Sequence, residues 1–315
     1  MDRFVGAVQT FLDNISSVEW RWLVLAIAVH LAKAACRSRA WRNIVAAAYP
    51  GSAVRWRQLA GAYLAGVGVN AVLPARGGDV VRLMLARRSV EGSSYPTLVS
   101  TMAVETLVDV VLSLALLGWA IERGALPALD VLPRLRAFDL DWIIDHPVAT
   151  GAIGVGLLVV AGVLAWRAHP HVAAFAQHLR QGFAVLGDRR RYLRTVVPWQ
   201  LADWTLRIAG LYCFLRAFGI GFGIGIEVDL ENALLVQITQ SLSTLVPITP
   251  AGIGTEQALI AYVLAGKATV PELVSFSVGM NLVVIAANVV VGFTAIGLML
   301  RTFRWRRHLE PDRRA

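Results

Sequence analysis

The sequence contains several apolar runs that are long enough to cross a lipid bilayer, and these runs constrain the fold more than any other feature. They cover residues 97–121, 148–166 and 273–300, with shorter candidates at 20–36 and 195–215. A helix needs about 20 mainly apolar residues to span the hydrocarbon core of a membrane. Because 57% of all residues are hydrophobic, a soluble fold would expose too much apolar surface. The sequence therefore predicts an all-α fold, a polytopic transmembrane helix bundle.

Basic residues gather beside the apolar runs. Residues 37–57 contain five arginines and no acidic residue, whereas 122–147 contain more carboxylates than arginines. This asymmetry is typical of the positive-inside rule, so the net charge of +9 reflects membrane orientation and predicts no nucleic-acid partner. We expect a multi-pass protein of the cytoplasmic membrane whose basic tail, residues 301–315, lies in the cytoplasm.

The polar stretches between the apolar runs are too short to form a separate catalytic domain. Residues 20–305 are therefore expected to form one transmembrane domain. It divides into a first half at 20–121, a connector at 122–194 and a second half at 195–300. In residues 1–19 the apolar side chains recur on one helical face, which is typical of a helix lying in the membrane interface.

The first half is interrupted by a helix-breaking segment. An uncharged apolar run, residues 58–73, ends at Pro74 and is followed by Gly77 and Gly78. Proline cannot donate a backbone hydrogen bond, and two glycines allow a sharp turn. Broken backbone at membrane depth is tolerated where protein buries it or where it lines a wet cavity. We predict a re-entrant helical hairpin over 58–88, with Asp79 as the cap of its second helix. An ordinary loop between two short membrane helices is the alternative.

A second break follows the same order of elements in the other half. The apolar run 232–246 meets Pro247 and Pro250, then Gly252 and Gly254. The span near Trp22 precedes Pro74 by the same number of residues as the span at Thr195 precedes Pro247. Because 148–166 adds one crossing, the second half is expected to be inserted upside down. The fold would then consist of two inverted halves, each with a broken re-entrant hairpin, as in many transporters.

Charged residues near the first break are candidates for a substrate site. Arg76 and Arg82 flank the glycine turn, and a guanidinium beside a helix N-terminus can hold a phosphate or carboxylate. Glu105 and Asp109 share one face of the span 97–121, and charge inside a membrane usually marks function. The alternatives are that Arg82 extends to the membrane interface, that Arg76 pairs with a carboxylate structurally, and that Glu105 and Asp109 belong to a structural ion pair. The predicted substrate-binding set is Asn70, Arg76, Gly77, Gly78, Asp79, Arg82, Glu105, Asp109, Pro247, Pro250, Gly252, Gly254, Thr255 and Glu256.

Other polar residues in the spans are expected to be structural. Asp203 and Arg207 are four residues apart and can pair on one helix. Asn281 and Asn288 share a face of their helix and are expected to form hydrogen bonds to other helices. A more specific interpretation is that they line a polar path between the two halves. No serine or cysteine lies beside a credible base, and no His, Cys, Asp or Glu spacing indicates a metal site. We predict no catalytic residue, no metal and no cofactor.

Three motifs in order carry a family resemblance. They read Asn70-x-x-Leu-Pro-Ala-Arg-Gly-Gly-Asp-x-x-Arg82, Glu105-x-x-x-Asp109 and Pro247-x-x-Pro-Ala-Gly-Ile-Gly-Thr-Glu256. With them, residues 20–305 resemble the flippase-like membrane domain of lysylphosphatidylglycerol synthases. The sequence departs from the family by showing Pro-Ala-Gly-Ile-Gly where many relatives have a double glycine. It also does not contain the soluble aminoacyl-transferase domain of full-length synthases, which leaves the identity of the lipid open.

The resemblance implies a lipid translocase and not an enzyme. Such a protein would move a phospholipid or another amphipathic lipid with an anionic or zwitterionic headgroup between leaflets, with Arg76 and Arg82 on the headgroup. A lipid-synthesising enzyme is a candidate partner. Two alternatives stay open. One is a membrane glycosyltransferase that uses a polyprenyl-phosphate donor, supported only by Asp139 and Asp141. The other is a non-transporting subunit of a lipid-synthesis complex.

Overall fold

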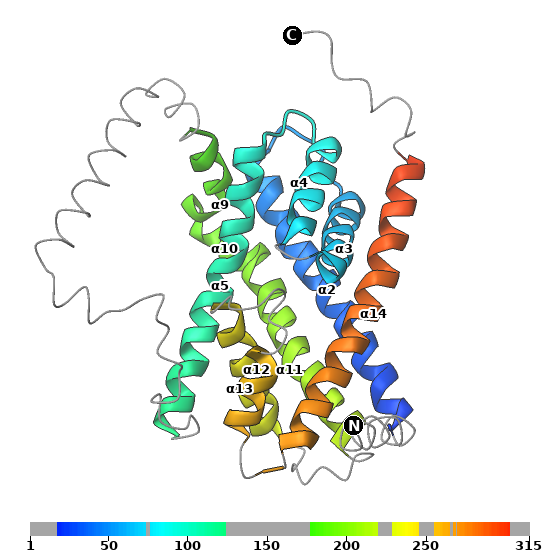
Figure 1. Ribbon diagram of the computed structural model, residues 1–315. Helices are drawn as coiled ribbons and strands as arrows, with labels where there is room; N and C mark the ends of the chain where they lie inside the picture. The colour runs from blue at the N-terminus through cyan, green and yellow to red at the C-terminus, as the bar shows by residue number, and fades with distance from the viewer. Residues whose placement is uncertain are drawn as a thin grey trace, which may run out of the picture.

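The protein is helical throughout the described part of the chain, which confirms the predicted all-α class. The computed structural model describes residues 18–73, 76–123, 177–219, 229–245, 255–264, 267–268 and 270–302, and it has no strand in these ranges. Figure 1 shows the helices as an elongated bundle. Residues 1–17 of the predicted interfacial helix, the span at 148–166 and the tail from 303 onward lie outside the described residues.

Ten helices have defined bounds within this part of the chain. They are α2 (Trp20–Ala48), α3 (Trp56–Val72), α4 (Gly77–Ser89), α5 (Tyr95–Glu122), α9 (Ala184–Gly187), α10 (Arg189–Thr195), α11 (Val197–Gly219), α12 (Leu230–Leu245), α13 (Thr255–Val263) and α14 (Val270–Thr302).

Two helices are long and apolar enough to cross a membrane by length and composition. They are Tyr95–Glu122 and Glu272–Leu300, where the spans 97–121 and 273–300 are predicted. In each helix only 17% of the most apolar 18-residue stretch is buried inside the protein, so most of its apolar side chains face outward. Val111 and Val290, for example, are both largely exposed. A core helix of a soluble protein would bury this surface instead, so the two helices indicate a membrane protein.

Helix α2 is longer than the sequence pattern predicts. The apolar run 20–36 and the basic segment 37–57 predict a span that ends near residue 36, but the helix continues to Ala48. No glycine or proline interrupts the chain until Pro50 and Gly51, so nothing stops the helix earlier. The boundary at residue 36 is therefore wrong, and Arg37 lies inside the bundle.

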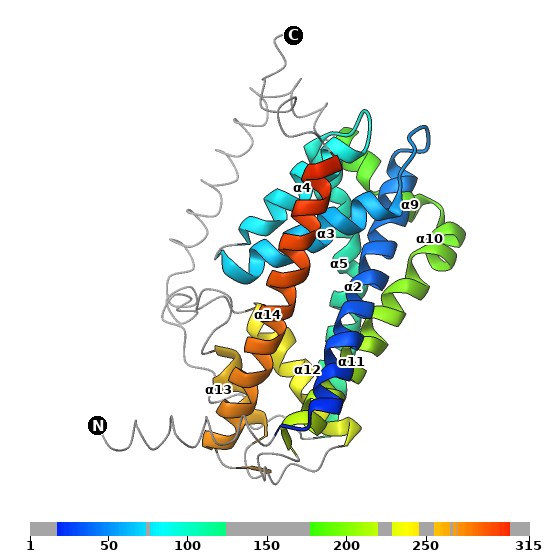
Figure 2. The same cartoon turned by 90° about the vertical axis from the view of Figure 1, so that its right-hand side faces the viewer.

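The long helices run the height of the bundle, and the short helices occupy its two ends. Helices α2 and α11 lie side by side in opposite directions (Figures 1 and 2). The backbone N–H of Glu19 donates to the carbonyl of Ala217 at 3.0 Å and links the start of α2 to the end of α11. Helices α3 and α4 lie in the upper half of Figure 1, whereas α12 and α13 lie in the lower half.

Each end of the bundle has its own apolar core. In the upper half, Trp41 and Leu59 are fully buried between α2, α3, α4 and α5. In the lower half, Leu235 and Phe276 are buried between α12, α14 and the ends of α2 and α11. The polar groups described below lie between these two clusters, on the middle turns of the long helices.

The turn between α3 and α4 is held by one side chain. Asn70 Oδ1 accepts the backbone N–H of Gly78 at 2.7 Å, and Asn70 Nδ2 donates to Asp79 Oδ1 at 3.1 Å. Asp79 is therefore not the helix cap. Arg76 occupies the N-cap position with a left-handed φ of 57° and no side-chain capping bond, while Asp79 lies in the first turn. A carboxylate in the first turn still favours the positive end of the helix dipole.

Glycines allow α3 to contact its neighbours at backbone distance. A Cβ on Gly78 would lie 2.0 Å from the Gly66 carbonyl oxygen, and a Cβ on Gly68 would lie 2.6 Å from Gly292 Cα. Both contacts are with backbone atoms, which cannot move aside as a flexible side chain can. Small residues at such crossings are the usual means of close helix packing in membranes. The contacts therefore fix α4 and α14 against α3.

We expect Gly292→Ala to destabilise the protein by about 1–3 kcal/mol, because the new methyl group overpacks the crossing of α3 and α14. Gly297→Ala is the matched control on the same helix, since a Cβ there meets nothing within 4 Å. Its stability should be unchanged or raised slightly, as alanine favours helix. Thermal unfolding of both variants in detergent measures the difference. Equal melting temperatures would contradict the proposed close contact.

Candidate functional site

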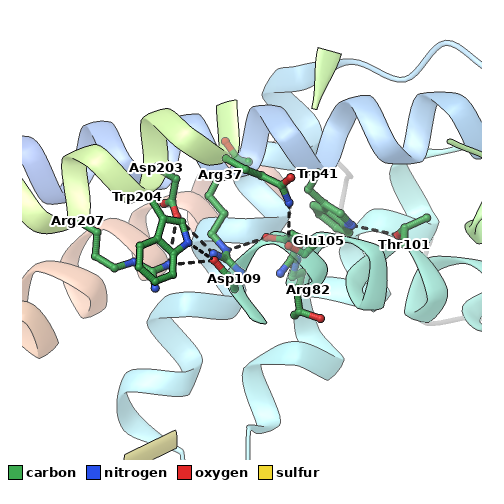
Figure 3. A network of polar contacts seen from close by, with 12 residues as sticks. Arg37, Trp41, Arg82, Thr101, Glu105, Asp109, Asp203, Trp204 and Arg207 are labelled. Carbon is green, nitrogen blue, oxygen red and sulfur yellow. Dashed lines mark hydrogen bonds and ion pairs between the residues drawn. The ribbon is translucent and has the colours of Figure 1, made fainter. Parts of the chain in front are cut away.

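Arg37 is the centre of a buried ionic network in the middle of the bundle (Figure 3). It lies on α2 and binds carboxylates from two other helices. Arg37 Nε is 2.8 Å from Glu105 Oε1, and Arg37 Nη2 is 2.6 Å from Asp109 Oδ2, both on α5. Arg37 Nη1 is 3.4 Å from Asp203 Oδ2 on α11. One guanidinium therefore holds three helices together through its fixed set of donors.

Arg82 brings α4 into the same network. Its guanidinium donates to Glu105 Oε2, on the opposite side of that carboxylate from Arg37. The guanidinium also lies over the rings of Trp41 and Tyr63, with centroid distances of 3.8 and 4.8 Å. Cation–π contacts of this kind stabilise a desolvated arginine. Glu105 is only 2% exposed, so water does not solvate its carboxylate. Arg37 and Arg82 together neutralise this buried charge.

The network ends on α11 in a second pair of charges. Arg207 Nη2 is 3.1 Å from Asp203 Oδ2 and 3.6 Å from Asp109 Oδ1. The predicted pairing of Asp203 with Arg207 is confirmed, but the pair is part of a larger group. Trp204 Nε1 also donates to Asp109 Oδ1 at 2.7 Å. In total, three arginines balance three carboxylates, so the network has no net charge.

Several buried polar atoms of the network lack a hydrogen-bond partner among the described residues. They are Arg82 Nε, Gln200 Oε1, Asp203 Oδ1 and Arg207 Nε. Gln200 does donate through Nε2 to the Glu105 backbone carbonyl at 2.8 Å. Buried polar groups are normally satisfied. The network therefore retains hydrogen-bonding capacity on the side of α11.

A polar cavity of about 140 Å³ adjoins the network. It lies between α2, α11, α12 and α14 and is lined by His30, Lys33, Arg207, Gln240 and Asn281 among apolar residues. Within the described part of the chain, no carboxylate lines this cavity and no ion pair forms with Lys33. Because the arginines are already balanced by the three carboxylates, Lys33 gives the cavity a surplus positive charge.

Glu256 lies behind the opposite wall of this cavity, on α13. Its carboxylate accepts hydrogen bonds from two of the lining residues, Gln240 Nε2 at 3.0 Å and Asn281 Nδ2 at 3.4 Å. His30 and Asn288 are hydrogen-bonded at 2.8 Å, which links α2 to α14. The predicted interhelical bonds of the two asparagines are confirmed. Of the two asparagines, Asn281 lines the cavity, and Asn288 bonds to His30, which also lines it.

The predicted site residues lie in several different parts of the structure. Arg82, Glu105 and Asp109 meet in the network, and Glu256 lies beside the cavity. Asn70, Gly77, Gly78 and Asp79 form the turn between α3 and α4. Arg76 lies apart, with its side chain 86% exposed and 3.4 Å from Asp79 rather than from the network carboxylates. Pro247, Pro250, Gly252 and Gly254 lie outside the described residues, as does the side chain of Thr255. The role of the set toward a substrate stays a prediction.

Two central residues are missing from the predicted set. The apolar run 20–36 and the basic segment 37–57 predict a loop position for Arg37 and a position at the end of a span for Lys33. Both expectations rest on the boundary at residue 36. The spacing of Lys33, Arg37 and Trp41 contains the missing signal, because residues four apart share one face of an uninterrupted helix. A polar face within a membrane helix points into the bundle.

We expect Arg37→Gln to destabilise the protein by about 3–5 kcal/mol, because it leaves buried carboxylates unbalanced. Adding Asp203→Asn to the same chain should recover part of this loss, since it removes one of those charges. Arg88→Gln, at an exposed position on α4, is the control for loss of one arginine. Thermal unfolding in detergent compares the wild type, Arg37→Gln alone, Asp203→Asn alone, the double variant and the Arg88 control. Additive effects of the two network substitutions would contradict the coupling.

The sequence of the chain matches a known protein family. The family described as "Lysylphosphatidylglycerol synthase TM region" matches residues 4–292. Glycosyltransferase AglD of Haloferax volcanii is 26% identical to the chain over 239 residues, which cover 64% of this chain and 36% of that protein. The chain therefore spans well under half the length of this relative. No solved structure matches the chain. Because the family match covers most of its length, the chain belongs to the lysylphosphatidylglycerol synthase TM region family, as its motifs predict.

Proposed function

We propose that the protein moves the polar headgroup of an amphipathic lipid between the two leaflets of the cytoplasmic membrane. The observation that carries the proposal is the polar cavity with its surplus cation, enclosed by helices whose outer surface is apolar. A lipid headgroup crosses a bilayer slowly because its polar groups lose their water. A polar cavity at the middle of the bundle would replace part of that hydration, while the acyl chains stay outside on apolar helices.

The cavity lining favours an anionic or zwitterionic headgroup. Lys33 and Arg207 present cationic donors on one side of the cavity. Gln240 and Asn281 lie on the other side and bind the Glu256 carboxylate. A phosphate would contact the cations, and an amine would approach the side nearer to Glu256. Lys33 is the strongest candidate for direct contact, because the arginines are already held by carboxylates.

The placement of the short helices supports access to the cavity from both ends. Helices α3 and α4 lie at one end of the bundle and α12 and α13 at the other (Figure 1). We propose that these pairs are re-entrant hairpins of two inverted halves. In this arrangement each hairpin closes the route on its own side, which is the usual basis of alternating access. The sequence has no nucleotide-binding motif, so transport would be passive or coupled to an ion.

In this proposal the ionic network has a supporting role. Its arginines and carboxylates neutralise one another, so it neither attracts nor repels a headgroup strongly. It does fix α2, on which Lys33 lies one helical turn from Arg37. A small change in the packing of α2 against α11 would therefore move the cation in the cavity. Arg82, Glu105 and Asp109 would position the site rather than contact the lipid.

Glycosyl transfer is the second candidate function, because the Haloferax volcanii relative is named as a glycosyltransferase. The residues that could support it here, Asp139 and Asp141, lie outside the described part of the chain. Their replacement by asparagine should leave lipid movement unchanged under the transport proposal. Under the transferase proposal the same replacement should abolish activity. A third candidate, a subunit without transport activity of its own, predicts that the purified protein alone moves no lipid.

The test uses the purified protein in liposomes that contain a headgroup-labelled anionic phospholipid and a quencher that reaches only the outer leaflet. We expect wild-type protein to expose clearly more than half of the label. Lys33→Met should slow the exposure about tenfold or more, since it removes a charge-assisted contact worth about 1.5–3 kcal/mol. Lys267→Met is the matched control, because Lys267 pairs with Asn232 and Glu231 away from the cavity.

Two results would contradict this proposal. If wild-type protein leaves half of the label protected for every headgroup tried, the protein does not translocate lipids by itself. If Lys33→Met and Lys267→Met slow exposure equally, the cavity is not the route. Melting temperatures of the variants show whether either substitution acts through stability instead.

A further inference from the structure

A second concave surface lies farther along α2, toward its C-terminal end, and is separate from the central cavity. It is a groove of about 870 Å³ between the end of α2, the start of α3 and the end of α14. Its lining includes Arg39, Arg42, Arg55 and Arg57, and no carboxylate among the described residues lines it. We call it the arginine groove. It shares no lining residue with the central cavity.

The four arginines are of two kinds. Arg39 and Arg42 are held by the protein. The Arg39 guanidinium lies 5.7 Å from the ring centroid of Trp56 and 5.9 Å from that of Trp199, and Arg42 Nε donates to the Val54 carbonyl at 2.9 Å. Neither is in an ion pair within the described part of the chain, so both keep their charge uncompensated.

Arg55 and Arg57 are exposed at the rim of the groove. Among the described residues their side chains form no hydrogen bond or ion pair, so their guanidinium donors are free to bind an anion. Four guanidinium groups around one concave surface would repel one another unless an anion lies between them. Arginine is also the side chain whose fork geometry best matches a phosphate. The charge of the groove therefore favours a phosphate group.

The floor of the groove is apolar. Ala60 and Leu64 of α3 face Ala295 and Leu298 of α14 across it. Leu298 is 60% exposed and lies on the apolar outer surface of α14, the helix that is long and apolar enough to cross a membrane. The apolar floor is thus continuous with the surface that contacts lipid. A soluble phosphate compound would leave this floor in water, whereas an acyl chain would cover it at about 25 cal/mol per Å² of apolar surface.

We propose that the arginine groove binds an anionic phospholipid of the adjacent leaflet. The phosphate lies among the four arginines, and one acyl chain lies along the floor between α3 and α14. This inference goes beyond lipid translocation, because the site is separate from the central cavity and its occupancy is measured without transport. It holds whether the bound lipid is later moved or remains as a fixed component of the protein.

The first test measures lipid binding to the full purified chain in detergent by native mass spectrometry. The probes are dioleoylphosphatidylglycerol and, as the zwitterionic comparison, dioleoylphosphatidylcholine. We expect tighter binding of the anionic lipid. The double substitution Arg55→Gln with Arg57→Gln should weaken its binding about tenfold or more, because two charge-assisted contacts are lost. Arg189→Gln with Arg190→Gln is the matched control, since it removes the same charge from exposed positions on α10.

The second test separates a lipid from a free phosphate compound. Ala60→Trp fills the apolar floor and leaves all four arginines in place, so it should weaken binding of the phospholipid. Glycerol 3-phosphate, which has no acyl chain, should bind far more weakly than the phospholipid to every variant. Equal competition by glycerol 3-phosphate, with no effect of Ala60→Trp, would overturn the lipid assignment in favour of a phosphate site.

The proposal is also overturned if the two double arginine substitutions weaken lipid binding equally, because the charge alone and not the groove would then matter. Failure of the liposome assay with selective lipid binding intact would reject transport and leave this site standing. Transport without selective binding would reject this site and leave the central cavity standing. All variants are surface or groove-lining changes, so their melting temperatures verify folding independently.

Discussion

The structure depends on how one guanidinium is neutralised inside an apolar bundle. An unpaired charge in the interior is strongly destabilising, and removal of one partner of a buried pair costs about 3–5 kcal/mol. Arg37 on α2 can therefore be buried only if Glu105 on α5 and Asp203 on α11 approach it together. This requirement fixes the relative position of three helices from both halves of the chain. Apolar packing alone would leave their rotation and depth less defined.

The requirement extends to the short helices through Glu105. Its second oxygen accepts from Arg82, so α4 can dock only where this arginine reaches the carboxylate. The approach is possible because α3 has a glycine at the crossing: a Cβ on Gly66 would lie 2.8 Å from Arg82 Cβ. The motif around Pro74 thus has a structural role besides any contact with a lipid. Its glycines and Arg82 belong to one docking arrangement.

The sequence predicts most elements but only part of this arrangement. Apolar runs locate α5 and α14, and Pro74 with its glycines locates the turn between α3 and α4. The four-residue spacing of Asp203 and Arg207 predicts their pair. The sequence does not predict the position of Arg37, because a run of arginines is typical of a loop at the membrane surface. A basic residue can nevertheless lie within a helix when carboxylates from other helices balance its charge. That balance is a tertiary property, and no local pattern contains it.

The central cavity and the arginine groove are two positively charged sites that both lie beside α14. Val284 at the central cavity and Ala295 at the arginine groove lie on the same helix, about 16 Å apart along its axis. Neither site has a carboxylate in its described lining, whereas the network near α2 is neutral. A bound headgroup at either site would therefore meet surplus positive charge, with a neutral region between. If a lipid moves from one site to the other, its acyl chains can follow the continuous apolar outer surface of α14 while only the headgroup changes its partners.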